Sequence, residues 1–585
     1  MMRVSFRVSV CLPAVLLLVL SVPVFGQRVE YPPTRVEAVT DQYHGREIAD
    51  PYRWLEDDYS EETLAWVEAQ NRVTFRYLES LPQRQRINSR LTELQDYERY
   101  SLPYKVGGYY VFMKNDGLQN QSVIFRQKGL KGKAEVLFDP NRLSEDGTTA
   151  FTGGLMSEDG RLFMYGYSES GADWRVMKVR DTKTGADLDD EIRWIKFANA
   201  VMTKDGKRFY YSRYDEPEEG KAMVAANVDH KVYCHRLGTD QSGDELILED
   251  PEHPDHLFFG SLSEDNDYFV IGVYRGSESN NGIYYIRTAR AAHGGVVRLI
   301  DEFDASYSFV GNDGETLYFM TNLDAPRFRL IAIDLGNPGR ENWREIIPEQ
   351  KDVLQVVSLL GGKFVAVYMH DASNRIRIFT RDGSGAGDVP LPAIGSVAEI
   401  SGGQDEPEMF FSFKSFAYPP TAYRYDISKN ELEVFRKSDV KVSPEDFITE
   451  QVFFTSADGE RVPVFLSYRK DALKEGKAPA YIYGYGGFGV SMTPYFDVEN
   501  LLWMEMGGIF ALVTARGGGE FGEDWHQAGV HAKRQNVYND FIGAAEYLIE
   551  KGYTSRDKLA IGGASNGGLV VGVCMTQRPD LFAVA

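Results

Sequence analysis

The chain is poor in cysteine and in positive charge, and after its first 30 residues it has no apolar run long enough to cross a bilayer. Of its three cysteines, Cys11 lies near the amino terminus, and Cys234 and Cys574 form neither a disulfide framework nor a metal-ligand spacing. The chain has 64 lysines and arginines against 86 aspartates and glutamates, a formal charge of −22. These shortages argue against nucleic acid and anionic membranes as partners, and we expect no cofactor and no metal.

The amino terminus predicts an export signal. Arg3 and Arg7 precede an apolar run, Leu12–Val24, that is too short for a comfortable membrane span, and small residues follow as far as Gly26. We expect residues 1–26 to be a signal peptide cleaved near Gly26, which makes the protein periplasmic or secreted; the alternative is an uncleaved anchor. The mature protein is then expected to have no membrane span and to be a monomer.

The length of 585 residues predicts at least two domains, and their patterns differ. Residues 27 to about 95 are helical in pattern, with Ser60 as N-cap before Glu61 and Glu62, and Pro82 marking the end of the helix. In the middle of the chain, a two-residue turn leads into an apolar, aromatic strand seven times, about 40 to 60 residues apart. The turns are Gly107-Gly108, Asp159-Gly160, Asp205-Gly206, Asp265-Asn266, Asp313-Gly314, Gly361-Gly362 and Gly402-Gly403. Repetition at this period favours a β-propeller with one four-stranded blade per unit over an array of β-sandwiches.

After about residue 438 strands alternate with helices. A hairpin is predicted at 452–468 around Asp458-Gly459, followed by strands at Ala480–Tyr483, Ile509–Ala515 and Leu559–Gly562. A helix is predicted from about Asp540 to Lys551, and another after Ser565. This alternation indicates a mostly parallel sheet covered on both faces.

Between the last predicted strand and helix lies Gly563-Ala564-Ser565-Asn566-Gly567, which fits G-x-S-x-G, the sharp turn that exposes a serine nucleophile in α/β-hydrolases. The turn needs small neighbours, and Gly563, Gly567 and Gly568 meet that need. The N–H of Asn566 can point at a developing oxyanion. A phosphate-binding turn is the alternative, but no G-K-[ST] or ribose-binding acid accompanies the motif.

The surrounding residues resemble the active-site signature of the prolyl oligopeptidase family of serine peptidases. The signature positions are Asp540, Ala544, Leu548, Gly563, Ser565, Gly567, Gly568, Leu569 and Val570, with the family's spacing. The stretches DPYRWLED (50–57), YGYGGF (483–488) and RGGGEFGEDWH (516–526) agree with the family, as do LQNQ (118–121) and, with one substitution, SGADW (170–174). The resemblance extends from about Tyr31 to the last residue.

The resemblance implies a doubly wound α/β-hydrolase domain interrupted by a seven-bladed β-propeller. The hydrolase would comprise residues 27–95 and 438–585, and the propeller residues 96–437. It also implies roles for matching residues. Ser565 would be the nucleophile, and the Tyr485 hydroxyl and the Asn566 N–H would form the oxyanion hole. Phe488 would line the proline pocket, and Phe197 would be a propeller residue that faces the substrate.

A serine nucleophile needs a base, and no histidine occurs among the 20 residues after Ser565. Asp580 is too close to be the triad acid, and His526 and His531 match no triad position of the family. We therefore expect the triad Asp and His beyond residue 585, and residues 1–585 alone to be inactive.

The function expected is a serine endopeptidase that cuts short proline-containing peptides after proline. Three alternatives remain. One is an oligopeptidase of basic (Arg/Lys) specificity, which would need a carboxylate-lined pocket. The second is a secreted esterase or lipase, although the HGGG-type oxyanion loop is absent. The third is a non-catalytic propeller binding protein that carries a dead hydrolase.

Overall fold

The computed structural model describes residues 30–222, 225–288, 295–474 and 476–585. The proposed signal peptide, residues 1–26, lies outside the described residues. The chain divides into two compact units after Ser89. We describe each unit by itself.

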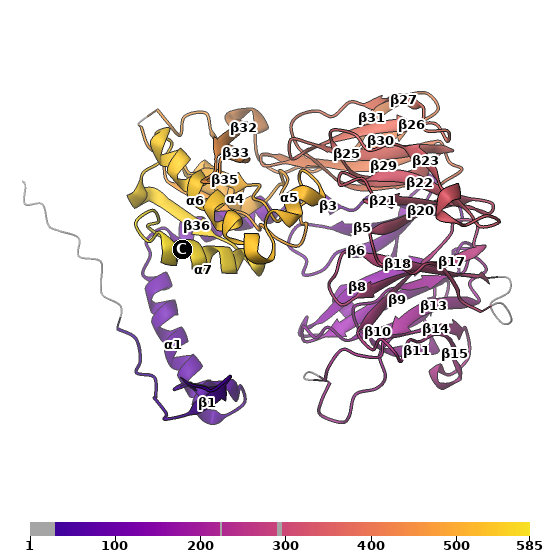
Figure 1. Ribbon diagram of the computed structural model, residues 1–585, viewed down its shortest axis with the longest axis horizontal. Helices are drawn as coiled ribbons and strands as arrows, with labels where there is room; N and C mark the ends of the chain where they lie inside the picture. The colour runs from indigo at the N-terminus through magenta and orange to yellow at the C-terminus, as the bar shows by residue number, and fades with distance from the viewer. Residues whose placement is uncertain (1–29, 223–224, 289–294, 475) are drawn as a thin grey trace, which may run out of the picture. The chain divides into compact units, whose positions relative to one another are not determined.

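The first unit contains a hairpin and a long helix (Figure 1). Strands β1 (Thr40–Tyr43) and β2 (Arg46–Ala49) pair around His44-Gly45, and both turn residues have positive φ, as a two-residue hairpin turn requires. Helix α1 (Glu61–Glu79) begins where the sequence predicts, because the Ser60 side chain accepts a hydrogen bond from Thr63 N. Helix α2 (Arg84–Gln95) continues into the second unit. The helices are confirmed; the hairpin was not predicted.

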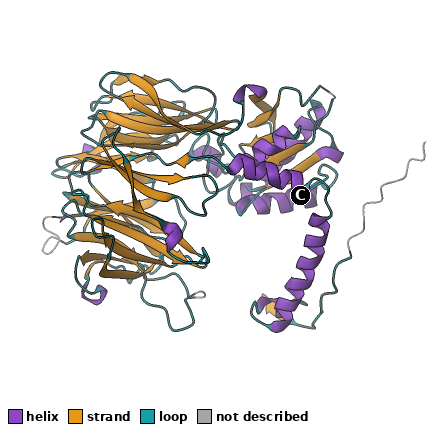
Figure 2. Cartoon of the chain, turned by 180° about the vertical axis from the view of Figure 1, so that it is seen from behind, coloured by secondary structure: helices purple, strands orange, loops and turns teal. Residues whose placement is uncertain are grey.

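In the second unit, the described residues 99–437 form seven antiparallel sheets, the blades of a β-propeller (Figure 2). Blade 1 contains β3 (Arg99–Tyr100), β4 (Tyr104–Val106), β5 (Tyr109–Asn115), β6 (Val123–Lys128) and β7 (Ala134–Phe138). Blade 2 contains β8 (Thr149–Met156), β9 (Leu162–Glu169), β10 (Arg175–Asp181) and β11 (Asp187–Ile195), and blade 3 contains β12 (Ala200–Met202), β13 (Arg208–Arg213), β14 (Lys231–Arg236) and β15 (Glu245–Leu248). Blade 4 contains β16 (His256–Leu262), β17 (Tyr268–Arg275), β18 (Asn281–Arg287) and β19 (Val297–Ile300), and blade 5 contains β20 (Tyr307–Asp313), β21 (Thr316–Thr321), β22 (Arg329–Asp334) and β23 (Arg344–Ile347). Blade 6 contains β24 (Val353–Leu360), β25 (Lys363–His370), β26 (Ser373–Phe379) and β27 (Gly385–Val389), and blade 7 contains β28 (Ser396–Gly402), β29 (Glu408–Ser415), β30 (Tyr418–Asp426) and β31 (Glu431–Lys437).

The seven turn signals of the sequence have one structural meaning. Each leads into the strand that is second in the order of its sheet: β5, β9, β13, β17, β21, β25 and β29. At one of the two-residue turns, Gly361 and Gly362 have φ of 56° and 71° between the paired residues Leu360 and Lys363. That backbone suits a two-residue hairpin turn and favours glycine. The predicted seven-bladed propeller is confirmed.

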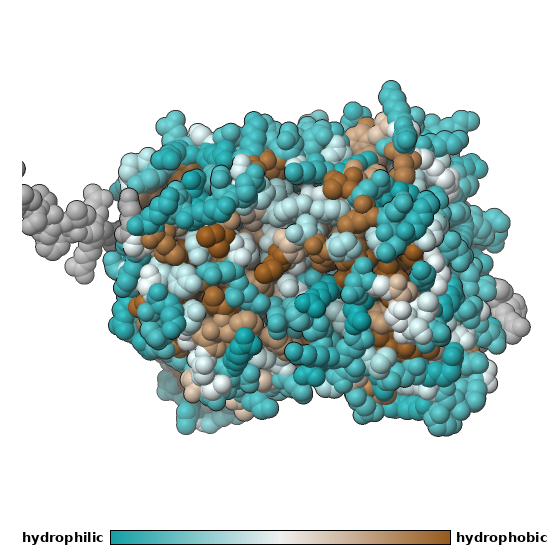
Figure 3. All heavy atoms as spheres, turned by 90° about the horizontal axis from the view of Figure 1, so that it is seen from above, coloured by the Kyte–Doolittle hydropathy of each residue, from teal (hydrophilic) through white to brown (hydrophobic). Residues whose placement is uncertain are grey.

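Apolar side chains pack between neighbouring blades. Strand β25 is buried along almost its whole length, and its Phe364 packs against Tyr318 of blade 5 with ring centroids 5.0 Å apart. Blades 1 and 7 each consist of strands from their own segment, and side chains join them: Tyr110 donates a hydrogen bond to Glu408 at 2.6 Å. Hydrophilic residues cover most of the face in Figure 3, with apolar residues between them in small groups.

Residues 447–585 form the hydrolase region. Its strands are β32 (Phe447–Thr455), β33 (Arg461–Arg469), β34 (Ala480–Tyr483), β35 (Ile509–Val513) and β36 (Leu559–Gly562), and its helices are α4 (Val498–Glu505), α5 (Glu523–Gln527), α6 (Gln535–Glu550) and α7 (Asn566–Gln577). The sheet order is β32-β33-β35-β34-β36, in which β34 pairs parallel with β35 and β36, and β33 pairs antiparallel with β32 and β35. The predicted hairpin, strands and helices are all present, and α6 begins five residues earlier than expected, at Gln535.

Short 3-10 helices complete the described elements: η1 (Arg53–Glu56), η2 (Pro140–Arg142), η3 (Gln241–Gly243), η5 (Arg340–Asn342), η6 (Pro444–Asp446), η7 (His531–Lys533) and η8 (Arg556–Lys558). Within the described ranges, no helix combines the length and the apolarity that crossing a bilayer requires.

Candidate active site

Ser565 occupies a strained turn between β36 and α7. Its φ of 55° and ψ of −120° are unusual for a residue other than glycine, and its side chain is exposed at the start of α7. A Cβ added to Gly563 would lie 2.5 Å from Gly567 O, and one added to Gly567 would lie 2.8 Å from Gly484 O. Both positions therefore require glycine. At Gly568 the nearest atom would be 3.8 Å away, an ordinary contact, so close packing does not require glycine there.

The side chain of Asn566 ties this turn to the Tyr485 loop. Its Nδ2 donates to Tyr485 O at 2.6 Å, and its Oδ1 accepts a hydrogen bond from the Arg534 guanidinium. Gly487 must be glycine, because a Cβ there would lie 2.5 Å from Asn566 Nδ2. The Asn566 N–H lies in the first turn of α7, where helices leave N–H groups without an intrahelical partner. The sequence predicted a role for this N–H but not for the amide side chain or Arg534.

The loop after β34 presents Tyr485 and Phe488. Their ring centroids lie 6.5 Å apart with an interplanar angle of 42°, and Tyr485 is half-buried. Phe488 has a φ of 55° and is 66% exposed. A positive φ in a bulky residue is strained, and such strain is found at functional sites. The structure therefore brings together four of the predicted site residues, Ser565, Asn566, Tyr485 and Phe488, through one loop and one helix start.

Phe488 lines a cavity of about 260 Å³. Apolar side chains of the propeller share its wall, and Glu523 and His526 contribute polar groups. Its apolar lining residues from the propeller are Met320, Phe328, Val353 and Leu354. The wall also includes the polar residues Ser279, Ser306, Asn322, Gln355 and Ser491, so only its apolar part suits a compact ring such as that of proline.

Asp540, the first residue of the family signature, belongs to a buried ion-pair network. The Arg516 guanidinium contacts both of its carboxylate oxygens, at 2.6 Å and 3.0 Å, and Ser456 Oγ donates to it at 2.6 Å. Burial raises the pKa of Asp540, and the hydrogen bonds from Arg516 and Ser456 oppose that effect. Arg516 also pairs with Asp458 in the β32–β33 turn. Asp540 therefore holds the RGGGE loop and the hairpin together.

A second buried carboxyl group, Glu520, lies in the same loop. It is 1% exposed, and its Oε1 accepts a hydrogen bond from Met492 N at 2.7 Å. Its Oε2 has no partner among the described residues, and burial raises the pKa of Glu520 to about 8. Glu520 is therefore protonated at pH 7. The sequence analysis assigned it no role, because nothing in a glycine-rich stretch indicates which polar side chain turns inward.

The histidines near the site are engaged elsewhere. His526 Nδ1 lies 3.0 Å from Gly489 N and 2.9 Å from Gly517 O, and His531 is exposed. Among the hydrogen bonds of the described residues, none joins a histidine to Ser565. These contacts agree with the expectation that His526 is structural.

Phe197 lies apart from these contacts. It follows β11 with a φ of 48°, and Lys196 Nζ lies 5.2 Å from its ring centroid. The contacts found in the described part of the chain do not link it to Ser565, Tyr485 or Phe488. Its role therefore stays a prediction.

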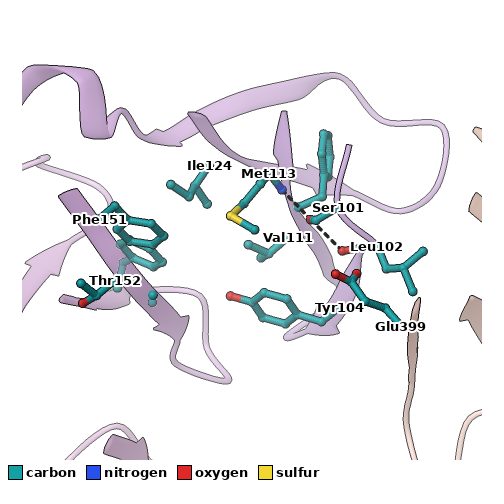
Figure 4. A pocket seen from close by; sticks show the side chains of 13 residues that line it. Ser101, Leu102, Tyr104, Val111, Met113, Ile124, Phe151, Thr152 and Glu399 are labelled. Atoms are coloured by element: carbon teal, nitrogen blue, oxygen red, sulfur yellow. Dashed lines mark hydrogen bonds between the residues drawn. The ribbon is translucent and has the colours of Figure 1, made fainter. Parts of the chain in front are cut away.

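A larger cavity, of about 470 Å³, lies within the propeller (Figure 4). Strands of blades 1, 2 and 7 supply its wall, which is mainly apolar. The Tyr104 hydroxyl has no hydrogen-bond partner among the described residues, and burial raises the pKa of Tyr104 to about 12. Ser101 Oγ is occupied by backbone, since it accepts from Met113 N at 2.9 Å and donates to Leu102 O at 3.0 Å. Its lining residues include no histidine or lysine that could activate a nucleophile.

Comparison with known families agrees with this architecture. Residues 31–438 match the N-terminal β-propeller domain of prolyl oligopeptidase, and residues 494–585 match the prolyl oligopeptidase family. The chain belongs to the prolyl oligopeptidase family. The predicted family, the combination of propeller and α/β-hydrolase domain, and the assignment as a serine peptidase are therefore confirmed.

The chain is 40% identical to a prolyl endopeptidase of Elizabethkingia meningoseptica over 557 residues, which cover 95% of this chain and 78% of the relative. It is 34% identical to prolyl oligopeptidase A of Amanita bisporigera, with the same coverage of the two chains. Among solved structures, one from a study of two prolyl endopeptidases superposes with a TM-score of 0.90 at 35% identity, covering 95% of this chain and 82% of that one. Prolyl oligopeptidase B of Galerina marginata, bound to a 35-residue hydrolysis and macrocyclization substrate, superposes with a TM-score of 0.88 at 31% identity, covering 94% and 80%.

Proposed function

We propose that this protein is an endopeptidase that hydrolyses short peptides on the carboxyl side of proline, with Ser565 as nucleophile. The observation that carries the proposal is the link between the strained serine turn and the YGYGGF loop, made by the 2.6 Å hydrogen bond from Asn566 Nδ2 to Tyr485 O. The relatives named prolyl endopeptidase and prolyl oligopeptidase support the choice of substrate.

Ser565 Oγ attacks the carbonyl carbon of the peptide bond after proline, and negative charge develops on the carbonyl oxygen. The Asn566 N–H stabilises that charge at the positive end of α7, and the Tyr485 hydroxyl is the second donor. The proton that leaves Ser565 needs a general base oriented by an acid. Ser565 has no such base among its described contacts, and we propose that residues outside the described ranges supply it.

Phe488 selects proline in this proposal, but Glu523 offers a reason to test basic specificity. Glu523 lines the same cavity, and a carboxylate there could receive a lysine or arginine side chain. Its Oε1 accepts a hydrogen bond from Gln527 Nε2 at 2.7 Å, which already occupies one oxygen. We expect kcat/KM to be much higher for Z-Gly-Pro amides than for amides ending in arginine. The reverse order would assign the protein to the oligopeptidases of basic specificity.

A fluorophosphonate probe tests the nucleophile, because it reacts only with activated serines. We expect it to label protein expressed from the complete gene, and the label to disappear in Ser565→Ala. Residues 27–585 expressed alone should stay unlabelled for lack of a base. Labelling of this shorter chain would show that His526 or His531 acts as base, whereas a complete protein that resists the probe would favour a non-catalytic binding protein.

We also propose that the protein is exported and acts as a monomer. The export proposal rests on Arg3, Arg7 and the apolar run Leu12–Val24. Amino-terminal sequencing of protein from fractionated cells should begin near Gln27, and an intact Met1 in the cytosolic fraction would refute export. Light scattering coupled to gel filtration measures the mass, and a dimer would refute the second proposal.

A further inference from the structure

Two histidines and an aspartate converge where the connection from β15 of blade 3 reaches β16 of blade 4, whose first residue is His256 (β15 is labelled in Figure 1). Asp250, His253 and His256 each offer one ligand atom, and these atoms all lie within 4.8 Å of one another. We propose that these three side chains bind a divalent transition-metal ion, with Zn²⁺ preferred. The sequence analysis overlooked this D-x-x-H-x-x-H spacing.

The local backbone places the three side chains on one side of the chain. His253 N donates to Asp250 O at 3.1 Å, and His256 N donates to His253 O at 3.1 Å. Successive bonds between residues three apart give about three residues per turn, so side chains three residues apart lie above one another. Pro251 and Pro254 alternate with the ligands and restrict φ in the same segment. The ligand set is therefore largely ordered before an ion arrives.

His256 is the most firmly fixed of the three. It is 4% exposed, and its ring stacks on Phe303 with centroids 5.3 Å apart. The connection is anchored directly before His256, because Pro254 O accepts from Asp229 N at 2.8 Å and Asp255 O accepts from Gly276 N at 3.2 Å. A rigid ring and backbone lower the entropy that binding an ion would cost.

The partners of Asp250 among the described residues are the two histidines, whose Nδ1 atoms lie at hydrogen-bonding distance from its Oδ2. The Asp250 side chain is 10% exposed, and none of the ion pairs between described residues joins it to a lysine or arginine. Arg298 lies within electrostatic range of Asp250 but pairs with Asp301 at 3.0 Å. A carboxylate removed from water needs a counter-charge or a metal.

The distances and donor types favour zinc over magnesium or calcium. Ligand atoms in a tetrahedral zinc site with bonds of about 2.0–2.1 Å lie about 3.3 Å apart. Asp250 Oδ2 lies 3.1 Å from Nδ1 of His253 and 3.1 Å from Nδ1 of His256. The side chain of His253 is 52% exposed, so its ring can tilt to close the remaining edge. Two imidazoles and one carboxylate suit Zn²⁺, Co²⁺ and Ni²⁺, whereas Mg²⁺ and Ca²⁺ prefer oxygen ligands alone.

Isothermal titration of protein from the complete gene, free of a polyhistidine tag and stripped with EDTA, tests the site. We expect one Zn²⁺ per chain and no comparable binding of Mg²⁺ or Ca²⁺. His253→Ala should lower the Zn²⁺ affinity by more than about 100-fold, the upper end of what the loss of an outer partner costs. Because His253 is half exposed, this variant should keep its fold. His44→Asn, which removes an exposed histidine in the first unit, is the matched control and should bind as the wild type does.

Two further measurements distinguish specific metal binding at these three residues from weak, nonspecific binding of ions at the surface. Co²⁺ should give the intense visible absorption of a four-coordinate ion, and Zn²⁺ should raise the Tm of the wild type and of His44→Asn but not that of His253→Ala. Equal Zn²⁺ affinity in His253→Ala and the wild type would overturn the proposal. So would the absence of a stoichiometric Zn²⁺ site in the wild type.

Discussion

Replacing Glu520 with glutamine tests how a buried acid shapes the stability of the hydrolase region. Glutamine has nearly the same shape and keeps an oxygen that can accept the hydrogen bond from Met492 N. Unlike Glu520, it cannot ionise. The comparison therefore isolates the free energy of burying the charge.

The magnitude follows from the pKa of Glu520, which burial raises from 4.5 to about 8. Below pH 4.5 the carboxyl is protonated in both the folded and the unfolded chain, so its ionisation does not lower the free energy of unfolding. Between pH 4.5 and 8 the unfolded chain releases the proton and the folded chain retains it, so the free energy of unfolding falls by about 1.4 kcal/mol per pH unit. The loss levels off above pH 8, at about 5 kcal/mol in total.

Urea denaturation at pH 6, 7 and 8, followed by tryptophan fluorescence, to which the buried Trp525 contributes among seven tryptophans, measures the effect. Between pH 6 and pH 8 the free energy of unfolding of the wild type should fall by about 2–3 kcal/mol more than that of Glu520→Gln. Glu523→Gln removes a half-buried carboxyl three residues away and should keep the wild-type slope. Parallel stability curves for the wild type and Glu520→Gln would refute the reasoning, because they would mean that Glu520 is equally ionised in both states.

Three more substitutions test the site. Tyr485→Phe in protein from the complete gene should lower kcat on a Z-Gly-Pro amide by about 10²–10³ with an unchanged circular dichroism spectrum, as expected for loss of one oxyanion donor; a near-normal kcat would mean that the ring only packs. Phe488→Ala should lower kcat/KM by about tenfold or more for a proline amide, and by less for the matched alanine amide, because the pocket loses apolar contact. An equal loss for both amides would mean that Phe488 does not determine the preference for proline. Arg516→Met leaves Asp540 buried without its ion-pair partner, so urea denaturation at pH 7 should show that the free energy of unfolding falls by about 3–5 kcal/mol. An unchanged free energy of unfolding would mean that water reaches the carboxylate.

The site depends on contacts that residue patterns do not encode. The G-x-S-x-G motif predicted the position of Ser565 in a strand-to-helix turn, and the structure has it there. No pattern indicated that the Asn566 amide would bridge Tyr485 O and Arg534, residues 81 and 32 positions away in the chain. Such a bridge exists only after β34, α6 and α7 have packed together.

The sequence by itself determined the local and the repetitive features of this protein. Ser60 begins α1 because its side chain caps the helix within four residues, and Gly361-Gly362 turns β24 into β25 because positive φ favours glycine. Both are short-range effects. The repetition of such turns before apolar strands along the chain predicted seven blades. Only the tertiary structure decided which polar side chains are buried away from solvent. The pKa of Glu520, the pairing of Asp540 with Arg516, and the meeting of Asp250 with two histidines all depend on burial, which is a property of the packed fold rather than of any short segment.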